Sequence, residues 1–248
     1  MVIIMAMQLR LDKYLANMGT GTRSEIKTWI RKGRVMVNGK PCTRPETKIV
    51  FDEDIVILDN CIIEYVEFVY YIMNKPSGVV SATRDNLSDT VIDLILEQDR
   101  KGKELFPVGR LDKDTEGLLV ITNDGELSHQ LLSPRKHVDK TYYARIRGVV
   151  TEEDTKAFFE GVDINDDSIT LPARLRIISS NDISEIELTI VEGRFHQVKR
   201  MFATVGKEVI YLKRVSMGNL KLDNTLLPGE YRMLTNDEVN SLKNNRLT

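Results

Sequence analysis

An arginine and two aspartates lie close together in the middle of the chain, in the string Gly109-Arg-Leu-Asp-Lys-Asp-Thr-Glu-Gly117. Residues 118–121, directly after this string, are apolar and predict a strand. A charged segment between two glycines and a strand is typical of a reactive carboxylate held at the end of an element. The pattern indicates Asp112 as that carboxylate, with Arg110 beside it. An isolated aspartate in a turn more often only caps the turn, so the string alone leaves a structural role open.

The sequence shows no pattern typical of nucleotide binding, metal binding or a disulfide framework. The sequence has no P-loop and no dinucleotide-binding glycine pattern. Cys42 and Cys61 match no metal-ligand spacing and no disulfide framework, which fits a reduced, cytoplasmic setting. His129, His137 and His196 form no ligand set with these cysteines. We therefore expect a reaction that needs neither a metal nor a cofactor.

The elements that must position Asp112 come from residues 66–240, where strands and helices are interspersed. Apolar and polar residues alternate over 185–190, which predicts a strand with one buried face. The segment 74–78, Asn-Lys-Pro-Ser-Gly, is a strong turn signal. Strands are expected at 68–73, 118–122, 141–147, 173–177, 185–190 and 208–212, and helices at 90–97, 126–132, 152–160, 195–205 and from Thr235 onward. Together they predict an α+β fold with a mixed, mostly antiparallel sheet flanked by helices.

Residues 7–60 predict a smaller, separate module of two helices and a hairpin. Apolar residues at helical spacing predict the first helix over 11–18. Thr22 and Glu25 have the spacing of a capping box and predict the start of the second helix. Asn38-Gly39 predicts a type I′ hairpin turn. Strands are expected at 34–37, 40–43 and 54–58.

Charge is unevenly distributed along the chain. The net charge is −2, but residues 8–48 hold ten Lys/Arg against three Asp/Glu, so they carry +7 and the remainder carries −9. A basic module joined to an acidic body suggests nucleic acid as a partner. Basic residues that recur at helical spacing form a ridge suited to RNA phosphates, which give affinity with little sequence choice. The expected RNA contacts are Arg10, Lys13, Arg23, Lys27, Arg31 and Arg34. A merely solvated charged face is the alternative.

Four segments resemble the motifs of pseudouridine synthases, in the same order along the chain. The string 109–119 resembles the catalytic motif, and 74–78 resembles the first motif. Lys140-Thr141-Tyr142 resembles the segment with the active-site tyrosine, and 193–201 resembles the third motif, in which a basic residue pairs with the catalytic aspartate. Residues 7–58 resemble the S4 RNA-binding domain. The resemblance lies with the branch that includes the ribosomal small-subunit enzyme.

The resemblance implies roles for individual residues. Asp112 would be the covalent nucleophile, and Lys199 would pair with it, a role for which Arg200 competes. Tyr142 would lie against the target base, although a core tyrosine on a strand face is the alternative. Arg110 would contact the RNA backbone or fill the space of the extruded nucleotide. The family reaction breaks the N1–C1′ bond of a uridine, turns the base and rejoins it through C5, and it uses no cofactor.

The resemblance further implies an enzyme that acts on ribosomal RNA, free or in a pre-ribosomal particle, as a cytoplasmic monomer. The 16S rRNA is the expected substrate and 23S rRNA the alternative. A non-catalytic S4-domain rRNA-binding or assembly factor is a second hypothesis. A nucleosidase is a third, with Asp114 as a second acid, although a spacing of two would point it away from Asp112 in an extended segment. No run of about 18 apolar residues occurs, so no membrane span is expected, and residues 1–7 are too few for a signal peptide.

Overall fold

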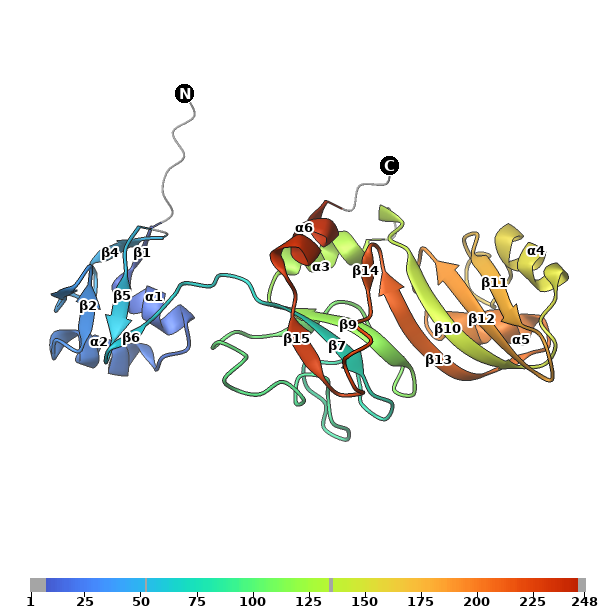
Figure 1. Cartoon of the computed structure of the whole chain (residues 1–248), viewed down its shortest axis with the longest axis horizontal. Coiled ribbons are helices and arrows are strands. Elements are labelled where there is room, and N and C mark those ends of the chain that lie inside the picture. The colour runs from blue at the N-terminus through green and yellow to red at the C-terminus, as the bar shows by residue number, and fades with distance from the viewer. Residues whose placement is uncertain (1–7, 52, 134–135, 245–248) are drawn as a thin grey trace, which may run out of the picture. The chain divides into compact units, whose positions relative to one another are not determined.

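The chain forms two compact units, shown in the computed structural model of Figure 1, which describes residues 8–51, 53–133 and 136–244. Residues 8–69 and 96–104 make the first unit, and residues 70–95 and 105–244 make the second. The interpretation of residues 1–7 falls outside the described residues. None of the described helices has the length and apolar character needed to cross a membrane.

The first unit contains two helices and six short strands. They are β1 (Gln8–Arg10), α1 (Leu11–Asn17), α2 (Arg23–Arg31), β2 (Val35–Val37), β3 (Lys40–Pro41), β4 (Lys48–Val50), β5 (Val56–Leu58) and β6 (Cys61–Ile62). β1 pairs with β4, and the other strands form an antiparallel sheet in the order β3-β2-β5-β6. The capping box of Thr22 and Glu25 is present at the start of α2. Asn38 and Gly39 have φ angles of 52° and 75°, as a type I′ turn requires.

Residues 96–104 lie within the range expected for the larger module, yet they pack with the first unit. A Cβ atom added to Gly102 would lie only 2.3 Å from the Cα of Gly19, so the two backbones touch at this point. The ammonium group of Lys103 lies 5.6 Å from the centre of the Tyr65 ring. These contacts join residues that are 83 and 38 positions apart in the chain, so no local sequence pattern predicts them.

The second unit is built on a nine-stranded sheet. Its elements are β7 (Tyr70–Lys75), β8 (Phe106–Pro107), β9 (Glu116–Thr122), α3 (Gly125–Leu132), β10 (Lys140–Arg147), α4 (Glu152–Glu160), β11 (Arg174–Ser179), β12 (Ile183–Ile190), α5 (Gln197–Thr204), β13 (Glu208–Met217), β14 (Leu220–Lys221), β15 (Tyr231–Met233) and α6 (Asn236–Lys243). The sheet runs in the order β11-β12-β10-β13-β9-β7-β15, with β8 beside β9 and β14 beside β13. The predicted α+β fold with a mixed, mostly antiparallel sheet is confirmed.

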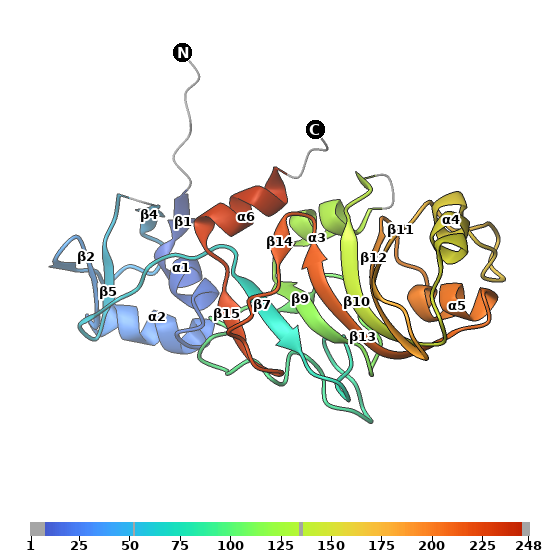
Figure 2. The ribbon, with the colours of Figure 1, turned by 45° about the vertical axis from the view of Figure 1, so that its right-hand side comes forward.

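Helices pack at both ends of this sheet, as Figure 2 shows. α3 lies beside α6, and Leu118 of β9 packs in one core with Leu127 and Leu131 of α3. α4 packs on β11 and α5 on β13, and Phe158 of α4 meets Phe202 of α5 edge to face at 5.0 Å. The strands β9, β10 and β13 lie in the middle of the sheet, and the two helix pairs pack on different parts of it.

β9 and β13 form the one parallel pair among the named strands that the structure describes, and they pair over only two positions, Lys213 with Glu116 and Arg214 with Gly117. Gly117 has a φ of 100°, and a Cβ there would lie 2.2 Å from the carbonyl oxygen of Arg214. The buried guanidinium of Arg214 donates from Nε to the carbonyl of Leu118 at 2.8 Å. The junction includes the last two residues of the string that contains Asp112.

The predicted helix over 90–97 is wrong. Thr90 instead forms an isolated parallel bridge with Val80, and the N–H of Val91 donates to the Val80 carbonyl at 3.0 Å. The following residues form turns closed by bonds such as the one from the Ile95 N–H to the Ile92 carbonyl. Val91, Ile92 and Ile95 are buried, whereas Leu96 is exposed, so the apolar spacing indicated part of the burial but not the conformation.

Other predicted boundaries differ by a few residues, and some strands were not expected at all. Asn74 and Lys75, predicted in a turn, are the last residues of β7, and Pro76 follows the strand. β13 continues to Met217, five residues beyond the predicted end. The unexpected strands β1, β4, β6, β8, β14 and β15 have only two or three residues each, too few for an alternating pattern to stand out.

Candidate active site

Asp112 lies in a loop between β8 and β9 that hydrogen bonds hold from several sides. The Ser81 hydroxyl accepts from the N–H of Leu111 at 3.1 Å and donates to its carbonyl at 3.0 Å. The N–H of Gly78 donates to the carbonyl of Lys113 at 2.8 Å. The N–H of Thr115 donates to the carbonyl of Asp112 at 3.1 Å and closes a turn. The segment after β7, where the first motif was recognised, therefore fixes the loop backbone.

Lys75 supports the same loop from inside the protein. Its side chain is fully buried, and the ammonium group donates to three backbone carbonyls at 2.9–3.3 Å, those of Pro76, Lys113 and Thr115. Burial lowers the pKa of Lys75 to about 8, although nearby carboxylates in the loop oppose this shift. A lysine buried in this way acts as a structural cross-link between the end of β7 and the catalytic loop.

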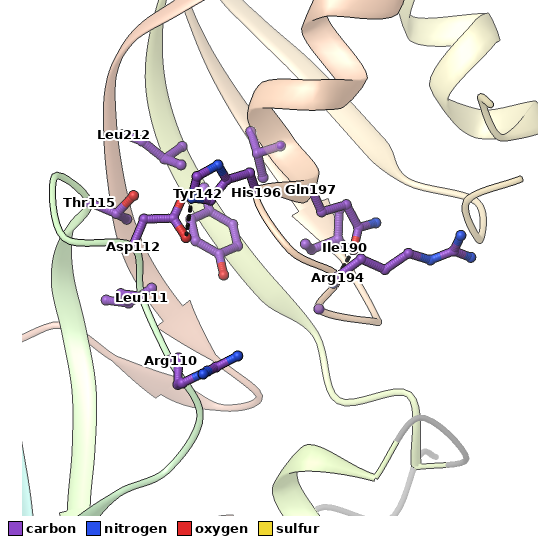
Figure 3. Close-up of a pocket in the computed structure, with 12 residues that line it drawn as sticks. Arg110, Leu111, Asp112, Thr115, Tyr142, Ile190, Arg194, His196, Gln197 and Leu212 are labelled. Atoms are coloured by element: carbon purple, nitrogen blue, oxygen red, sulfur yellow. Dashed lines mark hydrogen bonds and ion pairs between the residues drawn. The ribbon is translucent and has the colours of Figure 1, made fainter. Parts of the chain in front are cut away.

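The carboxylate of Asp112 faces two nitrogen groups from the N-terminal part of α5. Oδ2 lies 3.3 Å from the ammonium nitrogen of Lys199, and Oδ1 lies 3.7 Å from Nε2 of His196. Figure 3 shows Asp112 and His196 facing each other across the mouth of a cavity. The Asp112 side chain is only 24% exposed. The carboxylate is therefore neither turned out to bulk solvent nor buried away from a cation.

Lys199 binds a second carboxylate, that of Asp114, at 2.6 Å. Partial burial acts to lower the pKa of Lys199, but the hydrogen bond to Asp114 and the charges of Asp112 and Asp114 together raise it above its ordinary value. Partial burial acts in the opposite sense on Asp114, and the bond to Lys199 lowers the pKa of that carboxyl below its ordinary value. Lys199 is therefore positively charged beside Asp112 at neutral pH.

The prediction that Asp114 points away from Asp112 is wrong. It assumed an extended segment, whereas Lys113 and Asp114 form a turn. The turn brings both carboxylates to the same ammonium group. Arg200, considered as a competitor of Lys199, has other partners: its guanidinium binds the Asp166 carboxylate at 2.7 Å and the carbonyl of Phe195 at 3.2 Å.

Tyr142 and Asp112 line the same cavity, which has a volume of about 70 Å³. In β10, Tyr142 lies between two half-buried neighbours and shares its buried face with Ala144 and Ile146, as its strand spacing predicts. The ring is 8% exposed. Four apolar side chains contribute to the wall, namely Leu111, Ile190, Val198 and Leu212, together with polar ones such as Thr115, Arg194 and Gln197. The tyrosine thus belongs both to the core and to the cavity.

Arg110 stands at the edge of this cavity, away from the carboxylates (Figure 3). It is exposed and forms no ion pair with any described residue. His196 was not predicted as a site residue, because the histidines were considered only as metal ligands. Its place in the third motif, three residues before Lys199, is the sequence signal that could have identified it. No group of three His, Cys, Asp or Glu side chains suited to a metal occurs in the described part of the chain.

The six predicted RNA contacts all belong to the first unit. Arg23, Lys27 and Arg31 follow one another on α2, and with Lys13 they form no ion pair with a described residue. Arg34 lies beyond the end of α2, where it pairs with Asp59, and its guanidinium lies 4.9 Å from the centre of the Trp29 ring. Arg10 binds Asp12 through two hydrogen bonds of 3.0 Å. Arg34 thus lies next to β2 and not on α2, in agreement with the strand expected at 34–37.

Comparison with known proteins gives consistent matches. Residues 69–204 match the RNA pseudouridylate synthase family, and residues 9–55 match the S4 domain. An uncharacterised RNA pseudouridine synthase of Bacillus subtilis (strain 168) is 48% identical over 94% of this chain and 98% of its own. The ribosomal small subunit pseudouridine synthase A of Escherichia coli (strain K12) is 38% identical over 94% of this chain and 100% of its own.

A solved structure is similar over the same length. The crystal structure of a pseudouridylate synthase is 37% identical to this chain and covers 94% of it and 99% of its own chain, with a TM-score of 0.66. The sequence and structural matches thus agree, and they extend over both units.

Proposed function

The chain belongs to the RNA pseudouridylate synthase family, and we propose that it converts one uridine of 16S ribosomal RNA to pseudouridine, with Asp112 as the nucleophile. The relative named for the ribosomal small subunit, which aligns over its whole length, supports this choice of RNA. The observation that supports the role of Asp112 most directly is its position 3.3 Å from the charged Lys199, in a cavity shared with Tyr142.

Pseudouridine is an isomer of uridine, so the reaction needs no oxidant, no reductant and no net water. The N1–C1′ bond breaks, uracil turns while it stays bound, and C5 forms the new bond to C1′. The proton on C5 leaves, and N1 gains a proton. An oxygen of Asp112 forms a temporary covalent bond to the sugar or the base, which divides one difficult exchange into two easier steps. The carboxylate is free again when the product is complete.

The residues around Asp112 suit this sequence of steps. The Lys199 charge orients the carboxylate and stabilises it between turnovers. The ring of Tyr142 offers a flat surface against which a uracil can turn. Apolar side chains in the cavity wall, such as Ile190 and Leu212, would lie against the bound base and reduce the access of water to it. Exclusion of water protects a covalent intermediate from hydrolysis, which favours a synthase over a nucleosidase.

The first unit would hold the RNA while the cavity selects the uridine. Its basic side chains on α2 bind phosphates with little sequence choice, and Arg110 at the cavity edge would contact the backbone or replace the extruded nucleotide. A base must leave its stack to reach Asp112, at a cost of a few kcal/mol that is lowest in unpaired regions. We infer that the protein acts as a monomer in the cytoplasm, where ribosomal RNA is assembled.

A pseudouridine map of rRNA tests the proposal. Cells that lack the gene should lose one pseudouridine of 16S rRNA, and the wild-type gene should restore it. The Asp112→Asn variant should not restore it, although it should bind rRNA as wild type does, since the amide keeps the shape of the carboxylate without its charge. A lost site in 23S rRNA would overturn the choice of RNA. Unchanged maps, or free uracil released from RNA, would overturn the proposed reaction.

A further inference from the structure

Two aromatic rings form a stack at the rim of the Asp112 cavity, directly before α5. The rings of Phe195 and His196 have their centres 3.8 Å apart and their planes inclined by only 18°. His196 lines the cavity, where its Nε2 lies 3.7 Å from Asp112 (Figure 3). Phe195, the outer ring, is 71% exposed. The two stacked rings therefore extend from Asp112, which His196 faces, to the solvent, which Phe195 faces.

The segment that carries these rings is held firmly. His196 has a φ of 48°, a left-handed conformation that costs a non-glycine residue about 1–3 kcal/mol and that often marks functional sites. Arg200 donates to the carbonyl of Phe195 at 3.2 Å. The side-chain oxygen of Gln197 accepts from the N–H of Arg194 at 2.9 Å. These hydrogen bonds hold the backbone on either side of the two rings in place.

An exposed phenylalanine forgoes the burial through which aromatic side chains stabilise a fold. Phe159 on α4 is similarly exposed, at 63%, but it has no ring partner among the described residues. Phe195 differs because a second ring already stacks on it beside the reactive carboxylate. A further flat group placed on the exposed ring would extend an existing stack.

The substrate of this enzyme brings such a group to this place. When a uridine leaves its stack to reach Asp112, the bases that flanked it lose their stacking partner. A base that stacks on an aromatic side chain gains about 1–3 kcal/mol, with little dependence on which base it is. The stacked rings next to the cavity can therefore offset much of the free energy that extrusion of the uridine costs.

We propose that Phe195 and His196 form a stacking platform for the nucleobase next to the target uridine, with that base on the exposed ring of Phe195. Phe195 is then a positioning residue, which acts on the reaction by holding the RNA strand in the conformation that delivers the uridine to Asp112. This inference rests on the proposed function, because it requires an extruded uridine in the cavity.

A double-mutant cycle between protein and RNA tests the platform. Single-turnover kcat/KM is measured for wild type and Phe195→Ala on an RNA fragment around the mapped uridine, and on fragments with an abasic residue at either neighbouring position. Phe195→Ala should lower kcat/KM by about 5- to 100-fold on intact RNA. On the fragment without the stacked base, wild type and variant should be equal within twofold. Phe195→Trp should keep the wild-type rate, whereas Phe195→Leu, apolar but not aromatic, should not.

Phe159→Ala is the matched control, since it removes an equally exposed ring elsewhere and should leave kcat/KM unchanged. A second readout needs no turnover: 2-aminopurine at the neighbouring position should be quenched on binding to wild type and much less on binding to Phe195→Ala. Wild-type rates in Phe195→Ala, or an equal loss on intact and abasic RNA, would overturn the platform.

The outcomes separate the two proposals. The rRNA map is made first and decides which RNA carries the target uridine. If that uridine lies outside 16S rRNA, the proposed substrate fails, and the cycle is run on the RNA that the map identifies. The platform fails only if the cycle shows no coupling between Phe195 and a neighbouring base.

Discussion

Lys199 illustrates how one side chain organises this site. It contacts both Asp112 and Asp114, at 3.3 Å and 2.6 Å, so the ammonium charge is shared between the proposed nucleophile and a second carboxylate. Asp114 is 69% exposed and Asp112 only 24%. The exposed carboxylate keeps Lys199 charged and in place, and the more sheltered one stands beside the cavity where the uridine would bind.

Lys75 makes the stability of the protein depend on pH. Burial lowers the pKa of Lys75 from 10.5 to about 8, so between these pH values the unfolded chain holds a proton that the folded chain has lost. The contribution of this group to stability is therefore lowest below pH 8 and rises with pH up to about 10.5. In a comparison with Lys75→Met, the free energy of unfolding of wild type should gain up to about 3 kcal/mol between these limits.

Denaturant unfolding at a series of pH values measures this difference. Lys221→Met, which changes an exposed lysine, is the control and should follow wild type at every pH. Parallel curves for wild type and Lys75→Met would contradict the prediction, because they would mean that the buried amine does not titrate in this range.

Among the elements, the parallel pair of β9 and β13 leaves no room for a side chain at the point where the two strands meet. Gly117 lies where a side chain would meet the carbonyl of Arg214 at 2.2 Å, and the guanidinium of Arg214 reaches back to Leu118. The two halves of the sheet meet here over only two residue pairs. Since β9 begins directly after the catalytic loop, the junction also sets where Asp112 lies relative to Tyr142 on β10.

Gly117→Ala should therefore impair both folding and activity. The positive φ of 100° and the clash with backbone atoms add up, so we expect a loss of at least about 2 kcal/mol of stability. The variant should also have a lower kcat at temperatures at which it is folded. The added methyl group would displace β9, and the loop that contains Asp112 would be displaced with it. Gly125→Ala at the start of α3, where an added Cβ meets nothing within 4 Å, is the control. Equal thermal stability of the two variants would refute this account.

At the scale of the whole molecule, the residues proposed to bind RNA phosphates and the residues proposed to carry out the reaction lie in different units. The basic segment of residues 8–48, at +7, lies in the first unit, and the proposed active site lies in the second unit. Phosphate contacts would therefore come mainly from one unit, and base selection from the other. A higher salt concentration should therefore weaken RNA binding by the first unit without changing the rate of the chemical step in the second unit.

The triple variant Arg23→Gln, Lys27→Gln, Arg31→Gln tests this division. Each phosphate contact that is lost should reduce the slope of log affinity against log salt by about 0.7–0.9, so the slope for rRNA binding should fall by about 2–3. The single-turnover rate at saturating RNA should be unchanged. The matched control has the same change of charge in the same unit but away from α2, at Lys40, Arg44 and Lys48. Equal slopes for both triple variants would mean that only the total charge of the unit matters.

Local sequence patterns were enough to predict much of this protein. The capping box at Thr22, the Asn38-Gly39 turn and the alternating strand of Tyr142 depend on residues within four positions of one another. The basic segment is a property of composition. The catalytic string around Asp112 was recognisable because its residue types stand together, and the family it indicates is confirmed.

The tertiary structure decided what depends on contacts distant in sequence. Lys199 reaches Asp114 across 85 residues and Ser81 holds Leu111 across 30, and no short window contains either pair. Residues 90–97 keep a helical spacing yet form turns, because the bridge to Val80 takes the place of helical bonding. His196 reaches Asp112 only because α5 packs against β13. Local bonding sets where elements begin and end, whereas the packing of the sheet sets which side chains share one cavity.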